Sequence, residues 1–130
     1  MKQYDVIVAG GGMAGVSAAV NAARRGCSVL LVEQSGMLGG QGTSGQVNIV
    51  MASLYRFYGF GLELMEKLIA EGNAYLVPNP AVKGFRYYPF YGEKMKLALD
   101  KALAENGVDL LLHTKIFGVK REGDRITSLQ

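Results

Sequence analysis

Cysteine is nearly absent from this sequence, and long apolar runs are missing altogether. The single cysteine, Cys27, excludes a disulfide framework and a cysteine-based metal cluster within one chain. Low cysteine content fits a reducing compartment, and we expect the protein to be cytoplasmic. No run of about 18 apolar residues occurs, so the sequence predicts no membrane span. The first apolar stretch holds Asp5 and a glycine cluster and lacks a small-residue cleavage site, so we interpret it as mature structure rather than a signal peptide.

A strong charge of either sign is also lacking. The formal net charge is only +3 and the basic residues are scattered, so we expect no nucleic-acid partner. We expect no metal site either. The 130 residues, 49% apolar and 19% charged, predict one globular domain. What the chain does have is glycine: eighteen residues, gathered mainly at 10–15, 36–45 and 59–61, a distribution typical of tight loops between elements.

The first third of the chain predicts a βαβ unit. Residues 4–9 form a short β-branched apolar run, typical of a parallel strand buried on both faces. Residues 15–25 have helical spacing, with the small residues Gly15, Ala19, Ala22 and Ala23 on one face and Gly26 as the C-terminal cap. Residues 28–33 form a second buried strand, and the crossover should be right-handed.

Further along, the pattern predicts two more helices and a third strand. A helix over 61–70 would turn Leu62, Met65 and Ile69 inward, and residues 72–90, with all three prolines, read as an irregular surface segment. A helix over 92–106 is followed by a strand at 108–113 and by a hairpin whose turn is at 122–124. The apolar stripe of the helix over 92–106 comprises Met95, Ala98, Leu99, Ala102 and Leu103.

These elements together predict an α/β fold, a Rossmann-like parallel sheet with a β-meander or hairpin. We expect the strands in the order third, second, first. Such a sheet normally continues, so we also expect residues 1–130 to be an incomplete dinucleotide-binding domain, truncated before a last strand and a substrate domain. The first strand would then be an unpaired apolar edge, and self-association through that edge is expected.

The spacing Gly10-x-Gly12-x-x-Gly15 matches the dinucleotide fingerprint, and it lies between a predicted strand and a predicted helix. The first glycine permits the tight turn, the second lets backbone approach a pyrophosphate, and the third lets helix and strand pack closely. Glu33 ends the second strand, where an acidic residue accepts hydrogen bonds from a ribose and would repel a 2′-phosphate. FAD and NAD share the ADP half that these residues would bind, so the fingerprint does not distinguish the two cofactors. The third strand begins about 75 residues after Glu33, and this long interval favours FAD over NAD.

Three stretches of the chain carry a family resemblance: DVIVAGGGMAGVSAAVNAARRG, VLLVEQ and LGGQGTSG. They resemble the N-terminal part of FAD-dependent oxidoreductases with a glutathione-reductase-type FAD domain, most of all a bacterial group, and residues 91–129 are similar to that group's helix, strand and β-meander. The family's last FAD motif, a strand ending in an Ala-Thr-Gly-like turn, has no counterpart in these residues.

The resemblance implies a role for each matching position. Gly10, Gly11, Gly12, Met13 and Ala14 would hold the pyrophosphate, with Gly15 in the same fingerprint. Glu33 would bind the adenosine ribose, with Gln34 beside it. The second glycine loop would run past the pyrophosphate toward the flavin, and Ile116 would offer backbone groups to the adenine. The loop residues concerned are Gly39, Gly40, Gln41, Thr43 and Ser44.

Several interpretations stay open at this point. An NAD-binding or thiazole-synthase-like nucleotide-binding module without flavin chemistry is one alternative, and a cofactor-free scaffold is another. No residue stands out as catalytic for a small-molecule substrate: His113 and Cys27 read as structural. The aromatic stretch 84–92 could line a pocket or cover one face of a sheet. Thr43 and Ser44 could donate hydrogen bonds to a ligand or could be ordinary polar residues of a loop. Lys94, Lys96 and Lys101 read as a solvated helix face.

Overall fold

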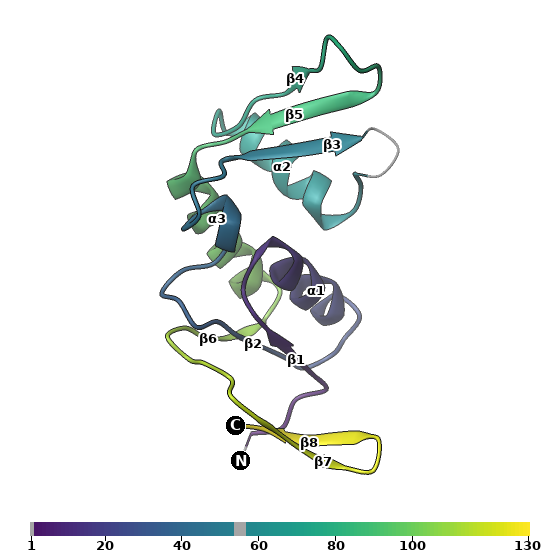
Figure 1. Cartoon of the computed structure of the whole chain (residues 1–130), viewed down its shortest axis with the longest axis vertical. Helices are drawn as coiled ribbons and strands as arrows, with labels where there is room; N and C mark the ends of the chain where they lie inside the picture. The colour runs from purple at the N-terminus through teal and green to yellow at the C-terminus, as the bar shows by residue number, and fades with distance from the viewer. Residues whose placement is uncertain (1, 54–56) are drawn as a thin grey trace.

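The computed structural model describes residues 2–53 and 57–130. Figure 1 shows three parts along the long axis of the molecule: a parallel sheet with two helices in the middle, an antiparallel sheet with one helix at one end, and a two-stranded hairpin near both termini at the other. We call the first two the parallel-sheet region (β1, β2, β6, α1 and α3) and the antiparallel-sheet region (β3, β4, β5 and α2).

The parallel sheet comprises β1 (Val6–Ala9), β2 (Val29–Val32) and β6 (Asp109–Leu111) in the order β1-β2-β6. Both pairs are parallel, which confirms the predicted order of third, second and first strand. The crossover helix α1 (Met13–Ala23) connects β1 to β2, as the periodicity predicts. Gly26 follows it with a φ of +85°, a left-handed conformation that suits a helix C-terminal cap.

The prediction that the first strand is buried on both faces is wrong. Val6 and Val8 pack against the core, while Ile7 on the opposite face is 39% exposed. Leu111 of β6 is 47% exposed as well. The cause is the placement of the helices, because α1 and α3 both lie on the same side of the sheet (Figure 1). Among the described residues, the other face of the sheet has no helical cover.

The buried face of α1 also differs from the prediction. Val16, Ala19 and Val20 are fully buried, whereas Gly15 and Ala22 are only half-buried. The helix therefore buries branched side chains as well as small ones. The predicted stripe followed the smallest residues, but burying the two valines removes more apolar surface from water.

Helix α2 (Phe60–Ala70) lies where a helix was predicted, with a different face turned inward. Met65 is buried as expected, but Leu62 and Ile69 are half-buried. Phe60, Leu64 and Leu68 fill the interior instead. Both stripes have helical spacing, so periodicity alone could not choose between them. In the structure the second stripe, which begins at Phe60, is the buried one.

The prediction of an irregular segment at 72–90 is wrong. β4 (Val77–Pro78) and β5 (Phe85–Pro89) pair with β3 (Ile49–Ser53) in an antiparallel sheet of order β3-β5-β4. Its prolines occupy positions that a sheet tolerates, because Pro78 lies in an edge strand and Pro89 is the last residue of its strand. Tyr88 and Phe90 are buried, so the aromatic stretch serves packing at these two positions.

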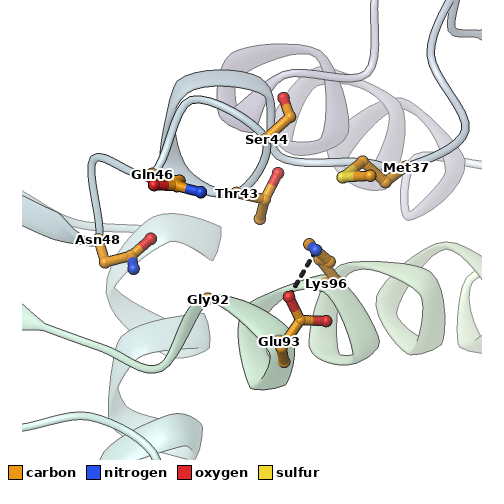
Figure 2. Close-up of a pocket in the computed structure, with 8 residues that line it drawn as sticks. All are labelled: Met37, Thr43, Ser44, Gln46, Asn48, Gly92, Glu93 and Lys96. Atoms are coloured by element: carbon orange, nitrogen blue, oxygen red, sulfur yellow. Dashed lines mark hydrogen bonds and ion pairs between the residues drawn. The ribbon is translucent and has the colours of Figure 1, made fainter.

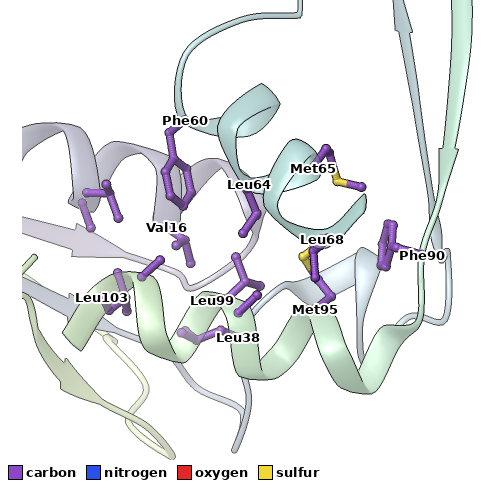
Figure 3. Close-up of a cluster of buried hydrophobic side chains, with 14 of the residues drawn as sticks. Val16, Leu38, Phe60, Leu64, Met65, Leu68, Phe90, Met95, Leu99 and Leu103 are labelled. Carbon is purple, nitrogen blue, oxygen red and sulfur yellow. The ribbon is translucent and has the colours of Figure 1, made fainter. Parts of the chain in front are cut away.

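Helix α3 (Gly92–Glu105) confirms its predicted stripe, because the five residues named above are its buried residues. β7 (Val119–Glu122) and β8 (Arg125–Leu129) form the predicted hairpin. The main core lies where the three helices meet: Figure 3 shows Val16 and Leu99 close to Leu64 and Leu68. Among the described residues, no helix is both long and apolar enough to cross a bilayer.

Candidate functional site

The first glycine loop, between β1 and α1, has the geometry that the fingerprint predicts. Gly10 has a φ of +103°, a left-handed conformation that a residue with a side chain rarely adopts. At Gly15, a Cβ atom would lie 1.9 Å from the carbonyl oxygen of Gly10. The turn therefore needs glycine at the first position, and the close approach of helix and strand needs it at the third.

The middle glycine of the fingerprint faces open space. Gly12 precedes α1 with ordinary extended dihedrals, φ −65° and ψ 175°, and a Cβ atom built on it would meet nothing within 4 Å. No side chain caps this end of α1. Backbone N–H groups at a helix N-terminus carry partial positive charge and bind phosphates well. The loop thus leaves bare backbone beside an open volume, which is what a pyrophosphate requires.

Glu33, just after β2, binds two backbone segments at once. Its carboxylate accepts hydrogen bonds from the N–H of Gly11 at 2.6 Å and from the N–H of Ser35 at 2.7 Å. Burial alone would raise the pKa of Glu33, but these N–H donors outweigh it and hold the pKa below its ordinary value. The ionised side chain therefore fixes the first glycine loop, a role that sequence reasoning did not assign to it.

The second glycine loop lies directly beside the first. The N–H of Gly39 donates to the carbonyl of Gly11 at 2.8 Å, and Gly12 and Gly39 form a parallel β-bridge. A Cβ atom on Gly40 would lie 3.4 Å from the Cα atom of Gly12. Two loops that are more than twenty residues apart in the sequence are thereby joined at the N-terminus of α1.

The hydroxyl groups of the second loop are used within the loop. Thr43 is buried, and its Oγ1 donates to the carbonyl of Leu38 at 2.5 Å. The Oγ of Ser44 donates to the carbonyl of Gly40 at 3.0 Å. Each hydroxyl has one proton, and both protons stabilise the loop. The oxygen lone pairs stay available, so each side chain serves the loop and can still accept a hydrogen bond from a ligand.

The remaining predicted residues lie at the margins of this site. Gln34 and Gln41 are exposed, and Met13 and Ala14 form the first turn of α1. Ile116 is half-buried in the connection between β6 and β7. That connection begins beside Glu33, whose carbonyl accepts the N–H of Thr114 at 3.0 Å.

His113 and Cys27 show no catalytic setting. The His113 ring packs against Gly36, where a Cβ atom would lie 2.6 Å from its Cε1, and Cys27 packs against the core. Among the described residues, no group of three or more His, Cys, Asp or Glu side chains is placed to hold a metal ion.

A pocket of about 500 Å³ opens where the second loop meets the start of α3. Figure 2 shows the loop residues on one side and the α3 residues on the other. The prediction of a solvated lysine face is wrong for Lys96, whose side chain is only 24% exposed and whose ammonium pairs with Glu93 at 2.6 Å. Lys96 lies three residues before Leu99 and seven before Leu103, at the margin of the apolar stripe of α3, and this spacing was the one weak signal of its partial burial. The lining comprises Met37, Thr43, Ser44, Gln46, Asn48, Gly92, Glu93 and Lys96.

A parallel sheet, a glycine turn at the first helix and an acidic residue after the second strand define a Rossmann-type dinucleotide-binding fold. Residues 5–130 match the family described as FAD dependent oxidoreductase, and the chain belongs to this family. The cofactor of the family is FAD, and the open, donor-rich N-terminus of α1 beside Glu33 fits a dinucleotide. No curated protein matches the sequence.

Solved structures share the fold at low sequence identity. THI4 from Thermovibrio ammonificans is 17% identical with a TM-score of 0.67, over 97% of this chain and 46% of its own. The myxobacterial chondrochloren halogenase CndH, an FAD-dependent halogenase, is 20% identical with a TM-score of 0.66, over 97% and 32%. A geranylgeranyl bacteriochlorophyll reductase-like protein from Thermoplasma acidophilum is 20% identical with a TM-score of 0.63, over 99% and 34%. The chain thus spans less than half the length of each of these structures.

Proposed function

We propose that this chain is the FAD-binding portion of a flavin-dependent oxidoreductase, with an FAD domain of the glutathione-reductase type. The observation that carries the proposal is the joining of the two glycine loops by Glu33 and by the bond between Gly39 and Gly11. This arrangement leaves bare backbone at one open position, Gly12, directly before α1. Residues 1–130 would then form one dinucleotide-binding domain.

Each part of the site has a role in this proposal. The N–H groups of Gly10 and Gly11 donate to Val32 and Glu33, so these two residues shape the turn around the pyrophosphate. The N–H groups of Gly12, Met13 and Ala14 bind the pyrophosphate, while Gly15 lets α1 approach closely enough to present them. Glu33 accepts hydrogen bonds from the adenosine ribose, which its remaining lone pairs allow. Gly39, Gly40, Gln41, Thr43 and Ser44 follow the cofactor toward its flavin end, with Gln34 beside the ribose and Ile116 beside the adenine.

In the whole protein, FAD would supply the redox chemistry, a hydride transfer between a small-molecule substrate and the flavin. The residues of this chain bind and orient the cofactor. We propose a cytoplasmic location, which fits the single cysteine.

A titration of the purified chain with FAD and with NAD tests the proposal. We expect saturable quenching of flavin fluorescence on adding the chain, and a yellow protein with absorbance near 450 nm. NAD should compete only weakly, because it shares only the ADP half of the site. A chain that binds NAD and not FAD, or one that binds neither, would overturn the proposal in favour of the nucleotide-binding module or the scaffold.

Self-association is a separate proposal. Among the described residues, β1 pairs only with β2 and is an edge of its sheet. The apolar side chain of Ile7 is partly exposed on that strand. Edge strands of this kind pair readily with another chain. Size-exclusion chromatography at tens of micromolar should show a dimer or larger species, and a clean monomer at that concentration would contradict the proposal.

A further inference from the structure

The pocket beside α3 has a polar lining that the proposed cofactor site does not fully use. It shares Thr43 and Ser44 with the residues assigned to FAD, while Gln46, Asn48, Glu93 and Lys96 have no role there. Its volume of about 500 Å³ lies within the range of small-molecule sites. Most such sites are largely apolar, so a lining this polar indicates a polar ligand.

The charges at the pocket are unequally exposed. The Lys96 side chain is 24% exposed, while that of its partner Glu93 is 84% exposed. Figure 2 shows the Lys96 ammonium within the ring of lining residues, joined to the Glu93 carboxylate. Because Glu93 is exposed and lies only three residues before Lys96 on the same helix, the ion pair contributes little to stability. The carboxylate of a ligand can therefore replace the Glu93 carboxylate as the partner of Lys96 at small cost. The Glu93 side chain can then rotate toward the solvent.

Opposite Lys96, two amide side chains face the pocket. Among the described residues, none forms a hydrogen bond with the side chain of Gln46 or of Asn48. Gly92 leaves space for the Asn48 amide, because a Cβ atom at position 92 would lie 3.1 Å from its Oδ1. The hydroxyls of Thr43 and Ser44 donate to backbone carbonyls of the loop, and Figure 2 shows both oxygens on the side away from Lys96. Within the part of the chain that the structure describes, the pocket thus offers one cation and two amide side chains, each of which can donate and accept a hydrogen bond.

We propose that this pocket binds a small organic acid that carries a hydroxyl or amino group, with Lys96 as the counter-charge of its carboxylate. The amide N–H groups of Gln46 and Asn48 bind the carboxylate, and their amide oxygens accept from the neighbouring hydroxyl or amino group. The proposal rests on the proposed function in one respect, because it makes this acid the substrate class of the flavin reaction.

Binding of malate to the purified chain, followed by ligand-observed NMR, tests the proposal. Lys96→Gln should weaken malate binding at least tenfold, while the matched control Lys94→Gln, on the exposed side of the same helix, should leave it unchanged. Glu93→Gln removes the competing carboxylate and should tighten binding about twofold. Erythritol, an uncharged polyol of similar size, should bind far more weakly. Circular dichroism of each variant checks that the fold is retained.

Three results would overturn the proposal: no malate binding to the wild-type chain, equal binding of erythritol, or equal binding to Lys96→Gln. A second series repeats the malate titration with saturating FAD. Malate that still binds supports a substrate site beside the cofactor, whereas loss of malate binding assigns the pocket to FAD and overturns the inference. If the chain binds malate through Lys96 but binds no FAD, the organic-acid site stands and the flavin role fails.

Discussion

The two sheets of this molecule meet different physical demands. In the parallel-sheet region, backbone geometry sets the residue type: only glycine fits Gly10 with its φ of +103°, and only glycine fits Gly15 against a carbonyl oxygen. In the antiparallel-sheet region, side-chain packing sets the residue type. The face of β3 and β5 that carries Tyr88 and Ala52 is buried, while Met51 on the other face is 69% exposed.

The difference shows where the chemistry lies. The parallel-sheet region holds its strict backbone positions at an open site, whereas the left-handed glycines of the antiparallel-sheet region, Gly59, Gly72 and Gly84, flank α2 and β5. Substitutions should therefore separate into two classes. Substitutions of packed residues will change the free energy of unfolding alone. A substitution at the open glycine, Gly12, will change ligand affinity alone.

The largest effect is expected from truncating the buried side of α2. Leu68 is fully buried, so Leu68→Ala should lower the free energy of unfolding by about 3 kcal/mol through lost burial and a cavity. Leu62, on the face that periodicity alone favours, is only half-buried, and Leu62→Ala should cost about 1 kcal/mol or less. Urea denaturation measures both variants. A larger cost at Leu62 would mean that the helix turns its other face inward.

Gly15→Ala should have the second largest effect on the free energy of unfolding. Alanine gains about 1 kcal/mol in helix propensity over glycine. The new methyl group would lie 1.9 Å from the Gly10 oxygen, so helix and strand must separate, and we expect a net loss of about 2 kcal/mol. The urea midpoint reports this loss. A variant as stable as the wild type would show that α1 does not pack so closely on β1.

Gly12→Ala sharpens the comparison, because it should act on binding and not on folding. The position has room for a Cβ atom and an ordinary φ of −65°, so its unfolding free energy should stay within about 0.5 kcal/mol of the wild type. The methyl group would occupy the proposed pyrophosphate position and weaken FAD binding at least tenfold, about 1.4 kcal/mol. Unchanged FAD affinity would place the phosphates elsewhere.

Glu33 should give the smallest effect, and one that depends on pH. Glu33→Gln weakens the bonds to the N–H groups of Gly11 and Ser35 and should cost about 1 kcal/mol at pH 7. Because the pKa is depressed in the folded state, this stabilisation is complete above the ordinary value of 4.5 and is lost as pH falls through the folded-state pKa. Denaturation of both proteins from pH 7 to pH 3 should show the difference shrinking on acidification, and a constant difference would contradict the role of the carboxylate.

Elements specified by glycine positions or by a single apolar stripe could be predicted from the sequence, and those that depend on long-range pairing or on a choice between two stripes could not. The βαβ unit, the α3 stripe and the hairpin turn at Gly123 were predicted because glycine positions and periodicity specify them, and the strand order was predicted from the expected dinucleotide-binding fold. The strands at 77–78 and 85–89 were missed because prolines mask a short edge strand, and only long-range pairing with β3 reveals them. The inward face of α2 was missed because two helical stripes compete.

For the candidate site, the fingerprint positions were predictable and their connections were not. The sequence places Gly10, Gly12, Gly15 and Glu33 in the expected order. That Glu33 binds the N–H of Gly11, and that Gly39 joins the same loop, depends on how two distant segments pack. Lys96 was missed because a lysine at the margin of an apolar stripe normally points into solvent.

The central claim is that FAD binds where the two glycine loops meet in the parallel-sheet region. A ¹⁵N NMR titration of the chain with FAD tests it residue by residue. We predict large shifts for the amide signals of Gly11, Gly12, Met13 and Gly40, and little change for those of Met51 and Tyr87 in the antiparallel sheet. Shifts confined to the antiparallel sheet, or none in either glycine loop at saturating FAD, would contradict the account.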